Sequence, residues 1–448
     1  MRIAVVGIGK LGAPLAAVLA SKGHDVLGVD VNSEAVRLMS EGRAPVDEPG
    51  LQELTTASRM RLTATTDFGA TADREVIIFL VPTPSDERGA FTNAYLVDAI
   101  DAVGRGLQTR TDYQVAVVAS TVMPGSCESE LWPALEEAAG RRIGESLGLC
   151  YSPEFIALGN VIGDMLAPDM VLIGESDPKA GEVLHRLYSG VCENSPPFRH
   201  MNLVNAELTK IAVNTYVTMK ISYANALADI CERLPGANVD AVTDALGLDT
   251  RIGSRYLRGA LAYGGPCFPR DNKAFAVLAR DLGADPALAE ATDAINVAQA
   301  ERLARIVQSR LGSGNAVGIL GLAYKPDTSV IDESPGIALA AVLSREGHDV
   351  NVYDPVALDA ALRVLPESVC GATSVADLLE RSDVVVISTP WPEFSELPLQ
   401  SLDPARQSLV VIDCWGILAV ERHAEAIDIV RLGRALKDRV GAQPPVRG

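Results

Sequence analysis

The chain has 448 residues, of which 48% are hydrophobic, so it can bury large cores and form two or three domains. Its 39 basic and 58 acidic residues give a formal net charge of −19, which argues against nucleic acid as a partner. No stretch approaches the roughly 20 apolar residues of a membrane span, and no signal peptide precedes the first strand pattern, so we expect a cytoplasmic protein. Seven scattered cysteines without a CxxC pair suggest neither a disulfide framework nor a metal site.

The amino terminus predicts a strand, a glycine turn, a helix and a second strand. The strand at residues 2–6 runs into Gly7-Ile8-Gly9-Lys10-Leu11-Gly12, and the helix ends near Lys22. In this context Gly7 permits the turn, Gly9 admits a pyrophosphate to the helix N-terminus, and Gly12 allows close helix packing. A glycine turn without a ligand is the alternative. The position of the motif between a strand and a helix favours dinucleotide binding.

Asp30 ends the next predicted strand, at residues 24–30. An acid at this place accepts hydrogen bonds from the adenosine ribose and repels a 2′-phosphate. We therefore predict that the cofactor is NAD rather than NADP.

Two further strand patterns end in turns that carry hydroxyl side chains. Residues 76–81 run into Pro82-Thr83-Pro84, and residues 115–119 run into Ser120-Thr121-Val122. Loops after the carboxyl ends of such strands line the cofactor crevice of a doubly wound sheet, so Thr83 and Thr121 are candidate site residues. A threonine in this position can also be an ordinary turn or cap residue.

Residues 263–271, Tyr-Gly-Gly-Pro-Cys-Phe-Pro-Arg-Asp, place one cysteine on an irregular turn. Two glycines and two prolines exclude a central strand or a helix interior around Cys267, and Asp271 follows four residues later. This is how a nucleophilic thiol would be presented, whereas a buried loop cysteine is the alternative.

Residues 199–234 contain neither proline nor glycine and have apolar residues at helical spacing, which predicts a long central helix. Lys210 and Asn214 stand four apart on one face of it, so an ammonium and an amide can converge on one substrate oxygen. A solvated lysine and an asparagine in a routine helix contact are the alternative.

A second nucleotide-type half begins near Asn315. Residues 317–321 resemble a strand entering a glycine turn, and residues 347–354 echo residues 23–30. Strand patterns at 384–388 and 409–412 extend this half, and the tail is expected to be flexible. The predicted fold is α/β, with two Rossmann-like doubly wound domains joined by a long central helix.

These residues resemble the nucleotide-sugar dehydrogenases, the UDP-glucose/GDP-mannose dehydrogenase family, over nearly the whole chain. The resemblance rests on motifs that occur in the order of the family: the glycine turn, Val81-Pro82-Thr83-Pro84, Ser120-Thr121-Val122, Ser152-Pro153-Glu154-Phe155, Glu207-xx-Lys210-xxx-Asn214-Thr215, Arg251-Ile252-Gly253, residues 264–271 and Gly321-Leu322-Ala323-Tyr324-Lys325-Pro326. It implies an NAD-binding domain at 1–198, a central helical dimerisation and catalytic domain at 199–300, a sugar-nucleotide-binding domain at 301–440 and a tail at 441–448.

The resemblance also implies roles for individual residues. Cys267 would trap the aldehyde intermediate as a thiohemiacetal, which a second oxidation turns into a thioester. Lys210 and Asn214 would stabilise oxyanions, and Asp271 and Glu154, with Thr121, would activate the alcohol or the water. The cofactor would contact Gly7, Gly9, Lys10, Leu11, Gly12, Asp30, Val81, Pro82, Thr83, Ser120 and Thr121. The sugar nucleotide would contact Glu154, Phe155, Lys210, Asn214, Arg251, Tyr256, Tyr263, Gly264, Phe268 and Lys325.

Three positions depart from the commoner family pattern. Leu158 stands in place of a glutamate, and Asp332 and Trp415 each stand in place of an arginine. They bear mainly on the substrate, for which UDP-glucose is the default and UDP-N-acetylhexosamine, TDP-glucose and GDP-mannose are alternatives. A two-electron hydroxyacid-type dehydrogenase and a catalytically silent nucleotide-binding protein also remain open. The expected partners are a nucleotide sugar and a second copy of the chain.

Overall fold

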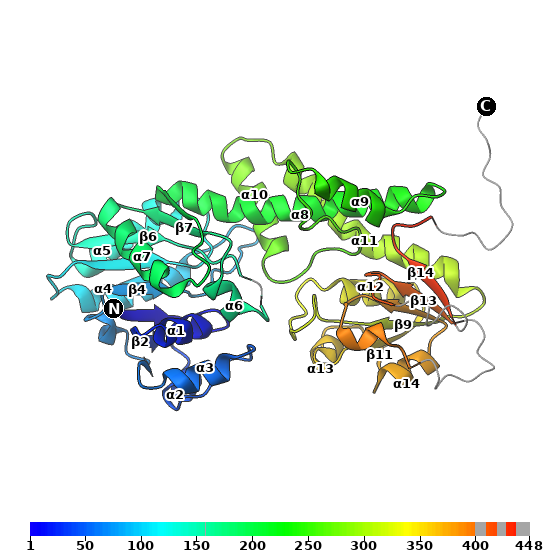
Figure 1. Cartoon of the computed structure of the whole chain (residues 1–448), viewed down its shortest axis with the longest axis horizontal. Helices are drawn as coiled ribbons and strands as arrows, with labels where there is room; N and C mark the ends of the chain where they lie inside the picture. The colour runs from blue at the N-terminus through cyan, green and yellow to red at the C-terminus, as the bar shows by residue number, and fades with distance from the viewer. Residues whose placement is uncertain (157, 399–408, 419–426, 436–448) are drawn as a thin grey trace. The chain divides into compact units, whose positions relative to one another are not determined.

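The computed structural model describes residues 1–156, 158–398, 409–418 and 427–435. The chain divides into two compact units: residues 1–213 with 277–284, and residues 214–276 with 285–448. Each unit contains a β-sheet with helices on both faces, and a long helix, α8 (Leu203–Arg233), runs from the first unit into the second (Figure 1). The predicted fold class is confirmed. The predicted tail lies outside the described residues.

The first sheet has eight strands in the order β3-β2-β1-β4-β5-β6-β7-β8. Neighbouring strands are parallel except β6 and β7, which pair antiparallel. The strand order reverses beside β1, which places a crevice at the carboxyl ends of β1 and β4. The strands are β1 (Arg2–Val6), β2 (Asp25–Val29), β3 (Leu62–Thr65), β4 (Val76–Phe79), β5 (Gln114–Val118), β6 (Leu147–Tyr151), β7 (Val171–Glu175) and β8 (Phe198–Met201).

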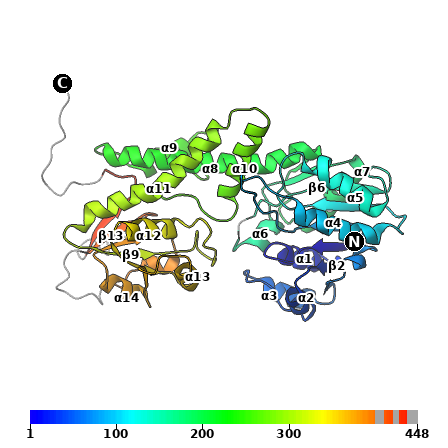
Figure 2. The same ribbon diagram turned by 180° about the vertical axis from the view of Figure 1, so that it is seen from behind.

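Alternating residues of the central strands pack into two cores on opposite faces of this sheet. Ile3 and Val5 belong to one core, and Ala4 and Val6 belong to the other. The first core contains residues of α1 (Gly12–Ser21), α3 (Leu51–Ser58), α6 (Val161–Leu166) and α7 (Pro178–Val191). The second contains residues of α4 (Ala94–Leu107), a π-helical turn (Cys127–Leu131) and α5 (Trp132–Ala139), and Figure 2 shows α4 and α5 from behind.

The glycine turn between β1 and α1 has the geometry expected of its motif. Gly7 has a φ of +94°, which favours glycine. A Cβ atom on Gly12 would lie 1.7 Å from the Gly7 carbonyl oxygen, so only glycine lets α1 begin this close to the strand. The turn therefore brings the N-terminus of α1 to the crevice.

The second sheet has six parallel strands in the order β11-β10-β9-β12-β13-β14. One face packs on α11 (Ala287–Leu311) and α12 (Pro335–Arg345), and the other packs on α14 (Val375–Glu380) and a 3₁₀ turn at Pro392–Ser395. The strands are β9 (Ala316–Leu320), β10 (Asp349–Tyr353), β11 (Cys370–Gly371), β12 (Val384–Ile387), β13 (Val410–Asp413) and β14 (Asp428–Arg431).

The second sheet repeats the close turn of the first. Gly321 follows β9 with a φ of +106°. A Cβ atom on Gly336, in α12, would lie 2.2 Å from the carbonyl oxygen of Gly321. The two halves thus use the same device to place a helix N-terminus at the carboxyl ends of the strands.

The remaining α-helices are α2 (Ser33–Ser40), α9 (Val239–Leu248), α10 (Phe268–Asp281) and α13 (Leu358–Leu362), and a further 3₁₀ turn spans Phe68–Thr71. Helix α8 begins later than residue 199, the predicted start, because residues 198–201 pair with β7 as strand β8. In the described part of the chain, no helix has the length and apolar character needed to cross a bilayer.

Candidate active site

A cavity of about 610 Å³ opens at the crevice of the first sheet, beside Gly7. Its walls are mostly apolar, and Asp30 and Asp98 bring negative charge to them. The Asp30 carboxylate follows β2 and accepts 2.8 Å hydrogen bonds from the backbone N–H groups of Ile8 and Asn32. Among the described residues that line the cavity none is basic, which disfavours a 2′-phosphate and favours the ribose hydroxyls of NAD.

The glycine turn leaves room for a pyrophosphate. A Cβ atom on Gly9 would meet no protein atom within 4 Å, so the space in front of this residue is open to a ligand. The N-terminus of α1, which favours negative charge, begins three residues later at Gly12, and Lys10 is exposed between them. This turn and the cavity beside it fit NAD.

The two loops that follow β4 and β5 are bound to each other. The Thr83 hydroxyl donates to the Thr121 carbonyl oxygen at 2.6 Å, and the Ser120 hydroxyl donates to the Val81 carbonyl oxygen at 2.7 Å. Ser120 and Thr83 are buried, whereas Thr121 is partly exposed. The structure thus brings these predicted cofactor residues together beside Pro82, which lines the cavity.

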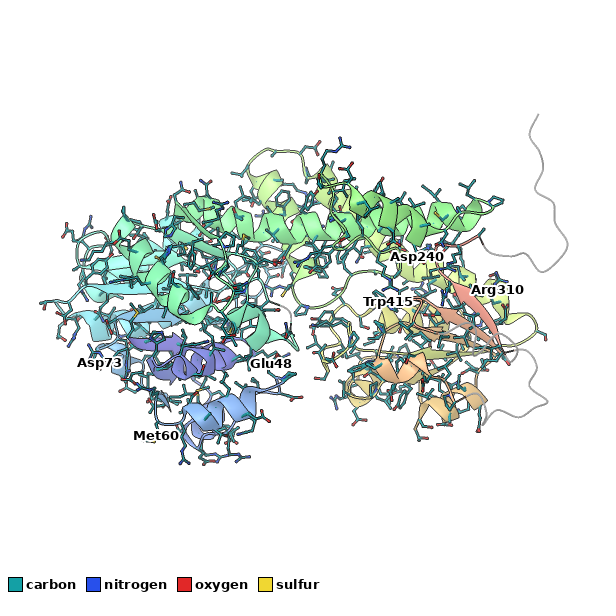
Figure 3. The ribbon with its side chains drawn as sticks, viewed as in Figure 1. Glu48, Met60, Asp73, Asp240, Arg310 and Trp415 are labelled. Carbon is teal, nitrogen blue, oxygen red and sulfur yellow. The ribbon has the colours of Figure 1, made fainter. Side chains whose placement is uncertain are left out.

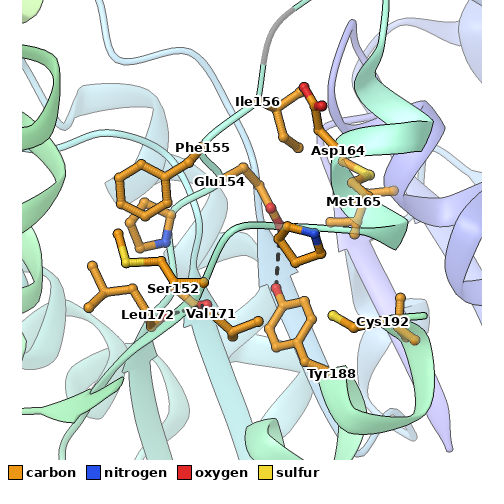
Figure 4. A pocket seen from close by; sticks show the side chains of 15 residues that line it. Ser152, Glu154, Phe155, Ile156, Asp164, Met165, Val171, Leu172, Tyr188 and Cys192 are labelled. Carbon is orange, nitrogen blue, oxygen red and sulfur yellow. Dashed lines mark hydrogen bonds between the residues drawn. The ribbon is translucent and has the colours of Figure 1, made fainter. Parts of the chain in front are cut away.

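The Glu154 side chain lines a small cavity beside the loop that follows β6 (Figure 4). The Tyr188 hydroxyl of α7 donates to Glu154 Oε1 at 3.4 Å. Burial raises the pKa of the Glu154 carboxyl to about 7, outweighing the positive charge of Lys210 and the Tyr188 hydrogen bond, which lower it. A carboxyl with this pKa can gain or lose a proton near neutral pH.

Lys210 lies on α8 beside the same loop. Its ammonium donates to the Glu154 carbonyl oxygen at 2.6 Å and lies 4.7 Å from the centre of the Phe155 ring. Lys210 is only 8% exposed, so the alternative of a solvated surface lysine is excluded. Asn214 follows one helical turn later and is also buried.

In the second unit, the Asn214 side chain meets Asp271 on α10. The Asn214 amide donates to Asp271 Oδ2 at 2.6 Å, and Asp271 is 4% exposed. Helix α10 begins at Phe268, directly after Cys267, and the Asp271 N–H donates to the Cys267 carbonyl oxygen at 2.9 Å. Cys267 is exposed, so the alternative of a buried loop cysteine is excluded.

The loop before Cys267 packs against the segment that precedes α12 in the same unit. The Gly265 N–H donates to the Asp332 carbonyl oxygen at 2.8 Å. A Cβ atom on Gly264 would lie 2.3 Å from the Glu333 carbonyl oxygen, so only glycine allows this approach. Asp332, one of the departures from the family pattern, therefore contacts the thiol-bearing loop through its backbone.

Three aromatic side chains surround the start of α10. Phe268 makes edge-on contacts with Tyr256 and Tyr263, at ring-centre distances of 6.2 and 6.4 Å. The Tyr263 hydroxyl donates to Asp293 at 2.6 Å, and the Tyr263 N–H donates to the Asn296 side chain at 2.8 Å. These bonds fix the Tyr263 side chain and backbone close to Cys267.

Two of the residues predicted to bind the substrate, Arg251 and Lys325, have exposed or partly exposed side chains. The Arg251 side chain is 86% exposed and pairs with Asp249 at 2.6 Å. Lys325 follows β9 and is partly exposed, with its ammonium 6.0 Å from the Tyr324 ring. A Cβ atom on Gly265 would lie 2.6 Å from that ring, so the turn after β9 packs on the thiol-bearing loop one residue before Lys325.

Trp415, another departure, lies after β13 (Figure 3). Its indole N–H donates to the Ser388 carbonyl oxygen at 2.8 Å. The guanidinium of Arg258 lies 6.0 Å from the Trp415 ring and donates to the Trp415 carbonyl oxygen. A basic group therefore reaches this position from another segment. The third departure, Leu158, packs against the core of the first unit.

Sequence reasoning missed Arg258 and gave no role to Glu207, because both depend on contacts between distant segments. Arg258 carries no local motif that would separate it from other exposed arginines. Glu207 stands three residues before Lys210 within a family motif, and that position was the available signal.

Three domain models of one protein family match successive parts of the chain. Residues 1–192 match the NAD binding domain of the UDP-glucose/GDP-mannose dehydrogenase family, residues 204–298 match its central domain, and residues 318–420 match its UDP binding domain. The chain belongs to this family. It is an NAD-dependent nucleotide-sugar dehydrogenase, as the sequence predicted.

Individual relatives match between 79% and 97% of this chain. A UDP-glucose 6-dehydrogenase of Haloferax volcanii is 35% identical, over 92% of this chain and 96% of that protein. A GDP-mannose 6-dehydrogenase of Pseudomonas aeruginosa is 32% identical over 79% of this chain and 81% of that protein. A solved UDP-glucose dehydrogenase from Pyrobaculum islandicum is 33% identical, with a TM-score of 0.87 over 97% of this chain and 98% of that chain.

Proposed function

We propose that this family member catalyses the four-electron oxidation of UDP-glucose at C6 to the uronic acid, with Cys267 as the nucleophile. The observation that carries the proposal is the start of α10, where an exposed thiol precedes a buried carboxylate bonded to Asn214. A two-electron dehydrogenase has no use for such a thiol, whereas a four-electron oxidation must retain an aldehyde between its two steps.

The residues of the chain divide the chemistry between them. Two NAD molecules would each accept one hydride, one molecule in each oxidation. Asp271 takes the proton of the C6 hydroxyl in the first oxidation, and Lys210 and Asn214 donate to the oxygen as negative charge develops on it. The aldehyde is held by Cys267 as a thiohemiacetal until the second oxidation gives a thioester.

Water must then hydrolyse the thioester. Glu154 is the proposed base for this step, because its raised pKa lets it accept a proton near pH 7. Thr121 belongs to the loop after β5, which the Thr83 hydrogen bond ties to the neighbouring loop, and it is the proposed partner of Glu154 in placing the water.

The substrate is proposed from relatives and from local charge. The two similar UDP-glucose dehydrogenases and the match to the UDP binding domain support UDP-glucose as the substrate. The similarity to a GDP-mannose dehydrogenase makes GDP-mannose an alternative substrate to test. Lys325 and Arg251 are the proposed phosphate ligands, and Arg258 adds a guanidinium beside Trp415. A panel of UDP-glucose, UDP-N-acetylhexosamines, TDP-glucose and GDP-mannose, followed by NADH absorbance, tests this assignment.

A homodimer is the proposed assembly. Helix α8 carries a row of exposed apolar side chains at near-heptad spacing, which a second copy of the same helix would cover: Leu208, Tyr216, Tyr223 and Ile230. Leu234, directly after the helix, is also exposed. We also propose a cytoplasmic location, since all seven cysteines are free, as expected in a reducing compartment.

A further inference from the structure

Glu207 is a buried carboxylate that bonds to backbone N–H groups. It lies on α8 with no exposed surface, and its two oxygens accept hydrogen bonds from the backbone N–H groups of Gly125 at 2.5 Å and Cys127 at 2.7 Å. Among the described residues, its hydrogen-bond partners include no lysine or arginine. Burial raises the pKa of this carboxyl although the hydrogen bonds from Cys127 and Gly125 lower it. An apolar side chain would fill this space without that desolvation cost.

The two N–H groups belong to a segment that cannot satisfy them itself. Gly125 has a φ of +96°, and the chain then enters a π-helical turn at Cys127–Leu131. The first N–H groups of a helical turn have no acceptor within it, and π turns are rare in proteins. Glu207 supplies the missing acceptors, so the path of this segment depends on the carboxylate.

The same segment contains the predicted cofactor residues Ser120 and Thr121. Its beginning is fixed to the loop after β4 by the Thr83–Thr121 and Ser120–Val81 hydrogen bonds. Its end is fixed to α8 by Glu207. Thr121 therefore belongs to the first anchor and lies shortly before the second, so the loss of Glu207 would free the chain on the carboxyl-terminal side of Thr121.

Glu207 also stands three residues before Lys210. One turn of α8 thus holds the loop after β5 through Glu207 and the loop after β6 through the Lys210–Glu154 hydrogen bond. We infer that Glu207 is a positioning residue for the reaction, which sets Thr121 against Lys210 and the cofactor. The inference rests on the proposed roles of Thr121 and Lys210.

The test replaces Glu207 with glutamine, which keeps the shape but can accept through only one oxygen. One backbone N–H then loses its acceptor. The expected result is roughly tenfold weaker binding of NADH, measured by its fluorescence, and a kcat at saturating NAD and sugar nucleotide that is lower by at least about tenfold. KM for the sugar nucleotide should stay within about twofold. Glu207→Asp, which withdraws the carboxylate, should give the same pattern and serves if the glutamine variant does not fold.

Asp383→Ala is the matched control, because it removes the one carboxylate oxygen to which two backbone N–H groups donate. Asp383 also accepts from two backbone N–H groups, those of Asn315 and Ala316, both at 3.1 Å, but at the amino end of β9. This variant should lower the melting temperature and leave kcat and NADH binding unchanged. A Glu207→Gln enzyme that is also less stable but keeps NADH affinity and kcat within about twofold of wild type would overturn the inference. If the wild type oxidises no sugar nucleotide, the proposed function fails, whereas the NADH titration still decides the role of Glu207.

Discussion

The side-chain amide of Asn214 on α8 donates a 2.6 Å hydrogen bond to the carboxylate of Asp271 on α10, and both residues are buried. Asp271 is one turn into the helix that Cys267 precedes, and its N–H donates to the Cys267 carbonyl oxygen. The first turn of α10 therefore fixes the spacing between the proposed nucleophile and a carboxylate whose position is set by α8.

Replacing Asp271 with asparagine should lower kcat by at least about a hundredfold, because the amide cannot accept the proton of the substrate hydroxyl. The fold should persist, since asparagine fills the same space. Steady-state NADH formation measures the loss. Asp281→Asn is the control, because Asp281 is exposed at the other end of α10 and pairs with Arg88. Turnover of Asp271→Asn within about threefold of the control would remove Asp271 from the mechanism.

Replacing Asp30 with asparagine should narrow the preference for NAD over NADP. The Asp30 carboxylate and Asp98 make the cavity wall negative, so the wild type repels a 2′-phosphate. Titration with the two reduced cofactors gives both affinities. Asp25→Asn is the control, because Asp25 is exposed at the start of β2, and this variant should leave the ratio of the two cofactor affinities unchanged. Equal affinities in the wild type would contradict the assignment.

Glu154→Gln should make the protein more stable than the wild type at pH 8 but not at pH 5. Burial raises the pKa of Glu154 to about 7, so the folded state binds a proton more tightly than the unfolded state. The stability that this group contributes is complete below its ordinary pKa, near 4.5, and is lost as the pH rises through about 7. Glutamine mimics the protonated form and avoids this loss.

Melting temperatures at pH 5, 6, 7 and 8 test this prediction. The difference between Glu154→Gln and the wild type should grow with pH, while Glu182→Gln, exposed on α7, should show no such trend. A constant difference across this range would show that Glu154 does not titrate near neutral pH. Wild-type turnover should rise over the same interval, because the base must be deprotonated.

Tyr223→Glu combined with Ile230→Glu should convert the proposed dimer to a monomer. Both side chains lie in the exposed apolar row of α8, and a pair of charges in a buried interface is strongly unfavourable. Sedimentation velocity at micromolar concentration gives the mass. Val364→Glu, an exposed apolar position outside α8, is the control. A monomeric wild type would reject the assembly.

Local sequence patterns predicted most of the fold. The apolar runs at 76–81 and 115–119 and the glycine turn at 7–12 are set by neighbouring residues, and the corresponding elements differ from the predictions by only a few residues at their ends. The helical spacing likewise predicted that Lys210 and Asn214 share one face of a helix. These features depend on short-range geometry, which the sequence displays directly.

Local sequence patterns could not predict the contacts between distant segments. The carboxylate of Glu207 meets Gly125 across 82 sequence positions, and Arg258 meets Trp415 across 157. The antiparallel addition of β7 to the first sheet also depends on tertiary pairing. No periodicity marks these pairs, because each depends on how whole elements pack.

The central claim is that Cys267 carries the intermediate between two oxidations, and its most direct test is the number of NADH molecules formed per sugar nucleotide consumed. The thioester mechanism predicts two NADH, a uronic acid product, and a transient increase in intact-protein mass equal to the bound acyl group. Cys267→Ala should retain the fold and lose this adduct and nearly all turnover. One NADH per substrate, with free aldehyde released and full activity in Cys267→Ala, would contradict this mechanism.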